Sequence, residues 1–573
     1  MAMEESFLKS VFHGAIPEEM VFPYPEPGRE QREHIGLILD GVRSFARKHV
    51  DAGAIDREAD IPESVLQGMR DLGLFGLTVP TEYGGAGLGA TGFARIIQEL
   101  AGYDASLAVT VGAHLSLGTS GLLLFGTEAQ RRRLLPGLAR GERIGGFALT
   151  EAGAGSDAAG IQTRAELDRA GETWTLDGTK AWVTNGGRAG LITVFARTTA
   201  FDMRSKPRLT AFLVEAGEGV VRGPNDLKLG LRATSTPWVR FEGAKVPSEN
   251  VLGEAGRGFR VAMEVLNGGR LSLAAGCVGM CRRLIRLSVD RAQERRAFGR
   301  TIGEFGMIKD KVARMMAETF ALESMVYLTT GMVDAKVPDW SLESAICKVF
   351  GSEVLWRAAD DALQIAAGIG YQQPHPCERM LRDARANPIF EGTNEVLRAF
   401  VALSGMQGPG RKLSEVVRAI REPIKGMGLM YEFAMQRART TFGRERMNRA
   451  HNTLRREVVI FEEYVAHFQR SIDKVLRRHG KDIAEMQYTQ RRVADLATDL
   501  YAMAAVISRT TRAIERKGEE GARREVELTM AFSNMAERRM AANLADFDDN
   551  DDEQRKGVAE QAYIDGGYSF DVV

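Results

Sequence analysis

The spacing of hydrophobic positions changes twice along the chain, from helical to alternating and back to helical. Between about residues 32 and 140, apolar residues recur every three or four positions, which predicts helices. The stripe expected on the first of these helices consists of Leu37, Ile38, Val42, Phe45 and Ala46. Between about 144 and 255, short alternating runs bounded by glycine, asparagine and aspartate predict strands, with a hairpin at 167–178. From about 257 to 405 helical spacing returns.

A fourth region follows the stretch GMQGPGRK at 405–412, where glycine and proline predict a break. Within this region apolar residues spaced by four and three predict one long helix, which should end at His479 and Gly480. The seam of that helix is Leu454, Val458, Phe461, Val465, Phe468, Ile472 and Val475. A second apolar face over 493–514 predicts a partner helix, joined in an antiparallel hairpin by about four residues. The acidic run at 546–553 is expected to be a solvated loop.

The length of 573 residues exceeds what one hydrophobic core supports, so we expect several domains in an α+β multidomain chain. Our boundaries are 32–143 for an N-terminal helical domain, 144–256 for a middle β domain, 257–405 for a second helical domain and 413–545 for a helical tail domain.

The composition indicates the cellular compartment more than the function. The 76 basic residues balance the 76 acidic ones, so the average charge does not indicate a polyanionic partner. The four cysteines show no metal-ligand spacing, which predicts no metal site and suits a reducing compartment. They are Cys277, Cys281, Cys347 and Cys377, of which the first two are expected in a helical core. The first residues resemble no targeting peptide and no run of about 18 apolar residues occurs, so we expect a cytoplasmic protein.

The stretch PIFEGTNEVLR at 388–398 is the first candidate for chemistry, because Glu391 follows Pro388, Ile389 and Phe390 and precedes a glycine. Apolar surroundings raise the pKa of a carboxyl group, and a base that works near neutral pH needs such a pKa. The alternative interpretation is structural: Thr393 or Asn394 caps a helix and Glu391 is a turn residue. These residues alone leave both open.

Two further stretches are suited to a flat, polar-edged ligand. FALTEAGAGSD at 147–157 leaves a strand and enters a glycine-rich turn, whose hydroxyls and amides can bind a ring edge or a phosphate. AWVTNGG at 181–187 places a tryptophan beside a threonine at another strand end. Either stretch alone is also common in ordinary loops and cores, so neither decides the function.

The order of the motifs is more specific than any one of them. TE-x-GAGSD, W-x-TNGG, RAFGR (296–300), LQIAAGIGY (363–371) and IFEGTNE (389–395) follow one another in a helix–β–helix chain. This set resembles the acyl-CoA dehydrogenase family over about 32–540. The resemblance implies FAD as cofactor and desaturation of acyl-CoA thioesters. It also implies that family's fold: an N-terminal helical domain, a β-barrel-like middle domain and a C-terminal four-helix bundle, here with an extra helical domain.

The resemblance assigns Glu391 as the catalytic base, which removes the α-proton while a hydride leaves the β-carbon for flavin N5. It also implies that the backbone N–H of Glu391 helps to hold the enolate oxygen, and a base of raised pKa suits a weakly acidic α-proton. Gly392 would let the backbone turn closely beneath the ligand.

The remaining site residues also come from the resemblance, position by position. Flavin contacts are implied for Phe147, Leu149, Thr150, Ser156, Trp182 and Thr184. Contacts with the rest of FAD are implied for Arg295, Phe298, Gln364, Gly368, Thr393 and Glu395, with Arg295 reaching the FAD of a second subunit. Contacts with the acyl-CoA substrate are implied for Ser156, Asn267, Arg270, Phe390 and Gly392.

Two positions depart from the family pattern. The usual paired glycine is Ala367–Gly368 here, which adds a methyl group near the cofactor. Ala297 replaces the threonine or glutamine that often precedes the phenylalanine of the FG pair, so one hydrogen bond to FAD is expected to be missing. These changes bear on FAD affinity and not on the base.

Phrases such as VPSENVLGE (246–254), VFGSE (349–353) and DLYAMAAVISR (499–509) resemble the very-long-chain branch of the family. The small residues Gly112, Ala113 and Gly118 agree with a long acyl pocket, although they equally allow close helix packing. We therefore expect long or very long acyl chains. The resemblance further implies electron transfer to electron-transferring flavoprotein and, because of the tail, a homodimer.

Residues 406–479 contain 16 basic and 8 acidic residues, and the segment 424–447 mixes methionine, phenylalanine and arginine. One hypothesis is that this segment contacts a membrane surface, which would make the protein membrane-peripheral, and the alternative is a solvated face. The positive charge also suits a DNA-binding protective flavoprotein of the same fold, but the intact base motif argues against nucleic acid. An assembly or scaffold role is a third hypothesis, and a direct oxidase is disfavoured because acyl-CoA oxidases diverge at these motifs.

Overall fold

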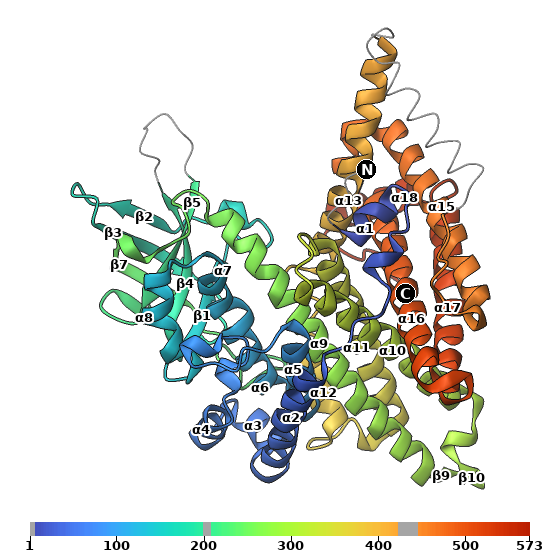
Figure 1. The fold of residues 1–573 in the computed structure, drawn as a ribbon, viewed down its shortest axis with the longest axis horizontal. Helices are drawn as coiled ribbons and strands as arrows, with labels where there is room; N and C mark the ends of the chain where they lie inside the picture. The colour runs from blue at the N-terminus through green and yellow to red at the C-terminus, as the bar shows by residue number, and fades with distance from the viewer. Residues whose placement is uncertain (1–5, 199–207, 422–444, 573) are drawn as a thin grey trace. The chain divides into compact units, whose positions relative to one another are not determined.

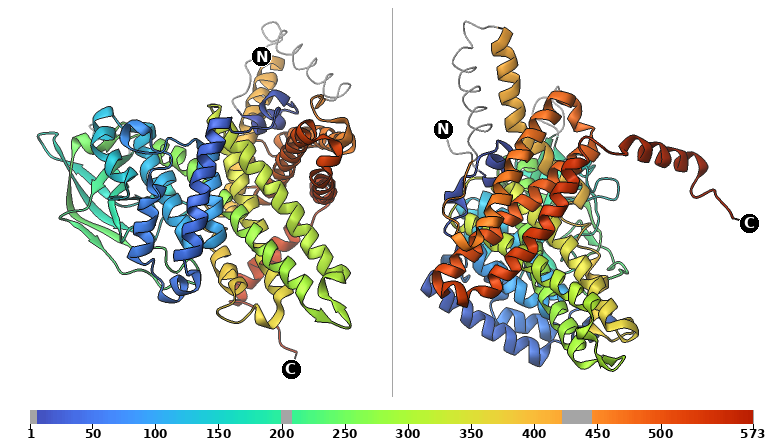
Figure 2. Two further views of the ribbon diagram at one scale, coloured as in Figure 1. Left: turned by 60° about the horizontal axis from the view of Figure 1, so that its bottom comes forward. Right: turned by 90° about the vertical axis from the view of Figure 1, so that its right-hand side faces the viewer.

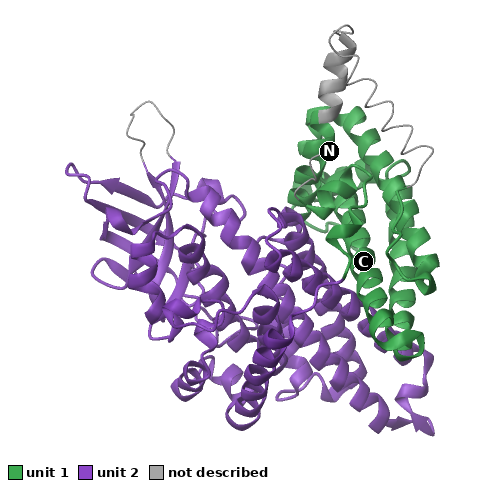
Figure 3. Cartoon of the chain, viewed as in Figure 1, with its two compact units in different colours: residues 1–23, 398–573 green, residues 24–397 purple. Residues whose placement is uncertain are grey.

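The computed structural model describes residues 6–198, 208–421 and 445–572, and its backbone contacts define two compact units. Unit 2 comprises Tyr24–Leu397, and unit 1 comprises Met1–Pro23 together with Arg398–Val573 (Figure 3). The sequence interpretation did not anticipate that the N-terminal residues join the C-terminal tail in one unit.

Unit 2 begins with helices (Figure 1). They are α2 (Arg29–His49), α3 (Ala52–Glu58), α4 (Glu63–Asp71), α5 (Ala90–Tyr103), α6 (Ala105–Ala113), α7 (Ser120–Phe125) and α8 (Glu128–Ala139). In α2 the buried residues Ile35, Leu39, Val42 and Ala46 keep helical spacing. The expected stripe was therefore wrong in part, because Leu37 lies on the opposite side and is 74% exposed.

A π-helical turn, η4 (His114–Thr119), separates α6 from α7. The buried imidazole of His114 joins this turn to the rest of unit 2: Nδ1 accepts from the Gly145 N–H at 2.8 Å, so Nε2–H donates to the Phe75 carbonyl at 3.0 Å. Burial lowers the pKa of His114 to about 4, which keeps the ring neutral. By length and composition, Ala105–Phe125 is also a candidate membrane span, but most of it is buried inside the protein.

The β region forms one mixed sheet in the order β6-β7-β3-β2-β4-β5-β8, with β1 paired to β4. Its strands are β1 (Ile144–Ala148), β2 (Arg164–Leu167), β3 (Thr173–Lys180), β4 (Ala189–Thr198), β5 (Arg208–Glu215), β6 (Val220–Arg222), β7 (Val239–Pro247) and β8 (Val251–Leu252). The predicted hairpin is confirmed, since β2 and β3 pair antiparallel with Leu167 opposite Trp174. The pairs β1–β4 and β2–β4 are parallel, so the sheet is not a simple meander.

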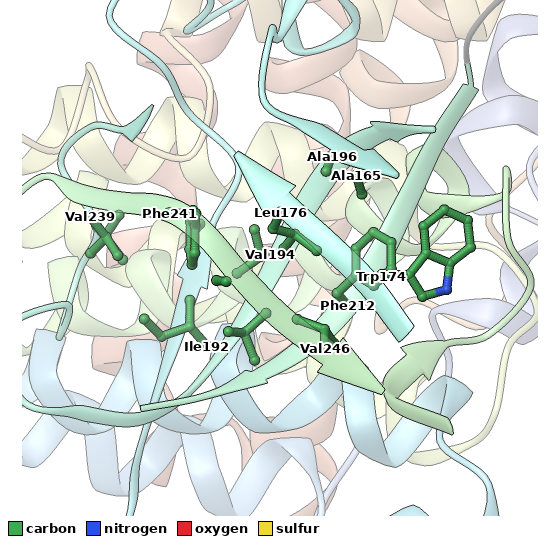
Figure 4. Packing of buried hydrophobic residues seen from close by; sticks show 14 of the residues in the cluster. Ala165, Trp174, Leu176, Ile192, Val194, Ala196, Phe212, Val239, Phe241 and Val246 are labelled. Carbon is green, nitrogen blue, oxygen red and sulfur yellow. The ribbon is translucent and has the colours of Figure 1, made fainter. Parts of the chain in front are cut away.

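The sheet curls over a single apolar core (Figure 4). Strands β3 and β5 are not neighbours in the sheet, yet the rings of Trp174 and Phe212 lie 5.4 Å apart, edge to face. Two halves of one sheet therefore pack against each other, and this packing fixes where the carboxyl end of β1 lies.

Three long helices complete unit 2: α9 (Gly258–Glu294), α10 (Gly306–Asp334) and α11 (Ser341–Ala366). A short hairpin of β9 (Arg296–Ala297) and β10 (Arg300–Thr301) follows α9, and α12 (Pro376–Ala384) follows α11. Helices α9 and α11 run in the same direction, because Ser344 donates to the Asn267 carbonyl while Gly351, seven residues on, lies against Ala274. The four cysteines are free and buried, as expected for Cys277 and Cys281.

The break expected at 405–412 was wrong, because α13 (Asn394–Arg421) continues through it. The glycines serve close packing within unit 1: a Cβ on Gly405 would lie 2.2 Å from the ring of Phe12, and one on Gly408 would lie 2.6 Å from His13. Only the tertiary contact with the N-terminal segment explains these glycines, so local propensity misled the interpretation.

Unit 1 contains the predicted hairpin as α15 (Arg455–His479) and α16 (Gln487–Gly521). The connection, residues 480–486, is longer than expected and contains a 3₁₀ turn, η10 (Gly480–Ala484). The other helices are α1 (Phe7–Phe12), α17 (Arg523–Ala545) and α18 (Asp552–Asp565). Figure 2 shows α18 at the C-terminal end of the chain.

The acidic run at 546–553 is not simply solvated. Asp552 accepts two hydrogen bonds of 2.6 Å from Arg492, whose side chain is 3% exposed, and Asp548 pairs with Lys474. Bidentate pairing with a buried guanidinium orders this part of the run.

The departure at Ala367 has a structural cost. Ala367 caps α11 with φ 58° and ψ −146°, a conformation that essentially only glycine adopts without strain. We expect Ala367→Gly to stabilise the protein by about 1 kcal/mol, because the relieved strain exceeds the added chain entropy of glycine. Calorimetric unfolding of the FAD-loaded protein measures this. Ala366→Gly is the matched control: at φ −68° it should destabilise by about 1 kcal/mol, and a lower midpoint for Ala367→Gly would contradict the strain.

Candidate active site

The turn that carries Glu391 lies between α12 and α13 and has an unusual backbone. Glu391 and Gly392 have φ of 61° and 90°, the left-handed region that favours glycine. Two buried cations hold this turn from neighbouring helices. Arg270 of α9 donates from Nε to the Glu391 carbonyl at 3.3 Å, and Lys348 of α11 donates from Nζ to the Gly392 carbonyl at 2.7 Å and to Asn394 Oδ1 at 2.9 Å.

The Glu391 carboxyl group faces an apolar cavity. Its Oε2 is buried and accepts no hydrogen bond from the described residues, although the residue as a whole is partly exposed. Burial raises the pKa of Glu391 to about 7, and the charges of Arg270 and Lys348 oppose this rise. The dry surroundings come from α9, where a Cβ on Gly269 would lie 2.7 Å from Oε2. They do not come from the neighbour Ile389, which is 54% exposed.

Lys348 is a residue of this candidate site that the sequence interpretation missed. Its side chain is fully buried, and burial lowers its pKa to about 8 while the charge of Glu391 opposes this change. A lysine within the apolar run SAICKVFG was a visible signal, since a buried lysine requires a partner. Helix periodicity alone could not reveal that the partner is the turn of Glu391.

The cavity in front of Glu391 is narrow, with a volume of about 60 Å³, and runs between α5, α6, η4 and α9. At about 1.5 Å per residue, its wall along α9 from Gly269 to Met280 is roughly 16 Å long. Most residues along this wall and on the facing helices are small: Ala101, Ala105, Ala108, Gly112, Ala113, Ser116, Gly269, Ser272 and Gly276. Of the small residues predicted to line an acyl pocket, Gly112 and Ala113 do, whereas Gly118 packs against Gly145.

Two other predicted site residues share this cavity with Glu391: Phe390 and Thr184 line it. The backbone N–H of Glu391 donates no hydrogen bond to any residue that the structure describes. A free N–H and a free carboxyl oxygen on one residue can serve an oxyanion and a proton, respectively.

The other predicted flavin contacts lie at neighbouring strand ends beside Thr184. Phe147 lies near the end of β1, and Leu149 and Thr150 follow the strand directly. The Ala181 N–H donates to the Thr150 carbonyl at 2.9 Å, which fixes the start of the Trp182 turn. Trp182 has φ 52° and is 58% exposed. Ser156 is exposed in the glycine-rich turn.

Asn267, Arg270, Thr393 and Glu395 lie close to the base. Arg270 donates to Asn267 Oδ1 at 3.0 Å, so the predicted substrate contacts form one unit with the Glu391 turn. Thr393 Oγ1 accepts from the Val396 N–H at 3.4 Å, so the helix-capping interpretation of this stretch is also correct. Glu395 is exposed on the first turn of α13.

Four predicted FAD contacts do not join this site within one chain. Arg295 and Phe298 lie beyond the end of α9, roughly 39 Å along the helix from Gly269 at about 1.5 Å per residue. Gln364 and Gly368 lie at the same end of the parallel helix α11, and all four are exposed. The structure therefore separates the predicted site into a group around Glu391 and a distant group.

The groups present suit a flat cofactor with phosphates. Trp182 and Phe298 expose 58% and 94% of their surface, although large aromatic side chains are usually covered. The hydroxyls of Thr150, Ser156 and Thr184 and the guanidinium of Arg295 supply donors for ring edges and phosphates. Among the residues that the structure describes, no group of three or more His, Cys, Asp or Glu could hold a metal ion.

A helical domain, a curled mixed sheet and a helical bundle around a dry carboxylate define the class of flavin-dependent dehydrogenases of acyl thioesters. Family models agree in order: "Acyl-CoA dehydrogenase, N-terminal domain" matches 32–142, the middle domain 146–244 and the C-terminal domain 256–406. A fourth model, "ACAD9/ACADV, C-terminal domain", matches 452–566. The chain belongs to the acyl-CoA dehydrogenase family and is an FAD-dependent acyl-CoA dehydrogenase.

Relatives of this chain include very long-chain specific members of the family. The chain is 41% identical over 522 residues to the very long-chain specific acyl-CoA dehydrogenase of Macaca fascicularis mitochondria, covering 90% of this chain and 80% of that protein. The FAD complex of acyl-CoA dehydrogenase from Bacillus anthracis has a TM-score of 0.79, 30% identity and coverage of 96% and 94%. Butyryl-CoA dehydrogenase from Megasphaera elsdenii (TM-score 0.62, 33% identity) covers 66% of this chain and 99% of its own.

The balance of charges around Glu391 predicts a pH dependence. With the pKa of Glu391 at about 7, kcat/KM should fall about tenfold per pH unit below 7, since only the ionised carboxylate accepts a proton. Lys348→Met removes a cation that favours this carboxylate, so the midpoint should move up by about one pH unit. Steady-state kinetics with an acyl-CoA ester between pH 5.5 and about 9 measure both.

Lys180→Met is the control for loss of a buried lysine. Lys180 is also fully buried with a pKa lowered to about 8 by burial, but it pairs with Glu151 in the β region. Its replacement should lower stability and leave the midpoint of the pH profile in place. An equal shift in both variants would show that Lys348 does not act on Glu391.

Proposed function

We propose that the protein dehydrogenates long-chain or very-long-chain acyl-CoA esters to trans-2-enoyl-CoA, the first step of fatty-acid β-oxidation, with Glu391 as the base. The observation that carries this proposal is the free, buried Oε2 of Glu391, with a pKa of about 7, facing a cavity lined by small residues. A carboxylate in this state is suited to remove a weakly acidic α-proton near neutral pH.

The chain's own residues supply most of the proposed mechanism. The Glu391 carboxylate takes the α-proton, and its N–H donates to the thioester oxygen as negative charge develops there. Arg270 and Lys348 hold the Glu391 turn in its left-handed conformation. Their charges also favour ionisation of the Glu391 carboxyl group near neutral pH. When bound, FAD would supply the acceptor for the hydride that leaves the β-carbon. Phe147, Leu149, Thr150 and Trp182 would orient the flavin beside Thr184.

The proposed chain length rests on the cavity wall. The wall along α9 is roughly 16 Å long and consists mostly of small residues, which limit the side-chain bulk that a long chain has to displace. The narrow volume of about 60 Å³ means that a long acyl group must displace side chains as it enters. Flexible Met280 and Leu273 line the cavity and can change rotamer.

We also propose a homodimer that completes each FAD site. Arg295, Phe298, Gln364 and Gly368 are exposed roughly 39 Å along α9 from Gly269, too far to serve the same cofactor as Glu391 within one chain. A second copy would bring them to it. Sedimentation velocity tests this proposal, and a monomer that retains FAD would contradict it.

Electron-transferring flavoprotein is the proposed electron acceptor, and the proposed location is cytoplasmic, with a peripheral membrane contact. Reduction of purified electron-transferring flavoprotein in the presence of an acyl-CoA ester tests the acceptor. Most of the basic segment 424–447 lies outside the described residues, so its proposed membrane contact rests on composition. Sedimentation with anionic vesicles tests it, and no binding at low salt would contradict it.

Glu391→Gln should abolish the reaction while leaving the cofactor bound, because the amide keeps the shape and cannot accept the proton. In an anaerobic titration with palmitoyl-CoA the flavin of the natural protein should bleach, and the rate in the variant should be at least about 10³-fold lower. Equal FAD content in both proteins is the control. Bleaching at a similar rate in the variant would assign the base to another residue.

Gly276→Leu should shorten the acyl cavity. Gly276 lies roughly 10 Å along α9 from Gly269, so a leucine there would block long chains and leave short ones. Reduction by palmitoyl-CoA should fall at least about tenfold while reduction by butyryl-CoA persists. Gly276→Ala is the control, since its Cβ would meet only ordinary contacts of 3.8 Å and 4.0 Å. Unchanged palmitoyl-CoA reduction in the leucine variant would contradict this path for the acyl chain.

A further inference from the structure

A second cavity in unit 2, with a volume of about 670 Å³, has no role in the reaction described above. Helices α2, α3, α5, α9 and α12 and the chain before α12 form its walls. Seven of its lining side chains are arginines and three are carboxylates, and none of its lining residues belongs to the cavity of Glu391. We refer to it as the arginine cavity.

The carboxylates of the arginine cavity are already bound to guanidinium groups outside the lining. Asp56 accepts from Arg382 at 3.0 Å and 2.6 Å, and Glu378 accepts from the same Arg382. Glu99 accepts from Arg43 at 3.0 Å. Among the lining arginines, Arg95 pairs with the lining acid Glu99. Arg282, Arg286 and Arg379 pair with acids outside the lining, namely Glu323, Asp290 and Asp104.

Several lining arginines have no partner. Arg47 of α2, Arg57 of α3 and Arg283 of α9 are exposed and make no hydrogen bond or ion pair with the residues that the structure describes. Arg95 of α5 uses Nη2 to bind Glu99 at 2.9 Å, but its Nη1 is buried without an acceptor. Unpaired guanidinium groups thus come from three different helices around one hollow, and α5 adds the unsatisfied Nη1 of Arg95.

The lining arginines favour one chemical class of ligand. A guanidinium group presents a planar fork of N–H donors that matches phosphate and carboxylate oxygens, and several such groups around a concave site favour a ligand with more than one negative charge. The N-terminus of α12 adds to this, since Pro376 at its first turn lines the cavity and the positive end of the helix dipole favours anions. We propose that the arginine cavity binds a polyanionic ligand that carries phosphate groups.

The arginine cavity lies on the other side of the contact between α5 and α9 from the proposed acyl cavity. Residues of α5 and α9 line both cavities from opposite sides of their contact, where a Cβ on Gly279 would lie 1.9 Å from the Gln98 carbonyl oxygen. This backbone contact separates the two spaces. Phosphate binding is therefore independent of the proposed dehydrogenation and is testable without substrate turnover.

Calorimetric titration of the FAD-loaded protein with inorganic pyrophosphate, in the presence of saturating CoA to occupy the thioester site, tests the proposal. We expect binding to the natural protein and at least about tenfold weaker binding in Arg47→Gln/Arg283→Gln, since hydrogen bonds to charged groups are lost. Arg29→Gln/Arg132→Gln is the matched control, because it removes the same charge from exposed arginines elsewhere and should leave binding unchanged.

An assay with vesicles distinguishes a lipid headgroup from a free phosphate compound as the ligand. Co-sedimentation with phosphatidylcholine vesicles that contain phosphatidylglycerol, lost in Arg47→Gln/Arg283→Gln, would assign a lipid headgroup. Pyrophosphate binding without vesicle binding would assign a free phosphate compound. No pyrophosphate binding by the natural protein, or equal binding by both double variants, would overturn the proposal. Arg57→Gln provides a second, independent variant at the rim, and it should also weaken binding.

Discussion

The burial of the Glu391 carboxyl group beside two buried cations is the constraint on which the rest of the site depends. Burial alone would keep the carboxyl group protonated at neutral pH, and full pairing with Arg270 or Lys348 would make it too weak a base. The structure avoids both outcomes because the cations bind backbone carbonyls of the turn and leave Oε2 free. The same contacts that set the charge balance therefore also fix the position of the Glu391 carboxyl group.

Helix α9 links the buried Glu391 turn to the remainder of unit 2. Gly269 lets the carboxyl group approach, Gly276 and Met280 line the same cavity, and Gly279 packs against the Gln98 carbonyl of α5. The far end of the helix carries the exposed residues expected to meet the cofactor of a second copy. A single helix of 37 residues thus lines both the cavity of Glu391 and the arginine cavity.

Backbone strain is concentrated where ligands are expected. Trp182, Phe298, Ala367 and Glu391 all have positive φ without being glycine, and each lies in a motif that resembles a cofactor or catalytic segment. Such conformations persist only where surrounding contacts enforce them. At Glu391 the enforcing contacts are visible in Arg270 and Lys348, whereas Ala367 is exposed at a helix end.

The sequence by itself determined the helix–β–helix order and the hairpin in the tail, and it singled out the Glu391 turn, because periodicity and motif order are local properties of the chain. It misjudged features that depend on distant residues. Leu37 and Ile389 look like core residues but are exposed, and the glycines of 405–412 serve packing against the N-terminal helix instead of a break. Only the tertiary structure brought Lys348 to the Glu391 turn and gathered unpaired arginines around one cavity, since neither partner choice nor burial is encoded in spacing along the chain.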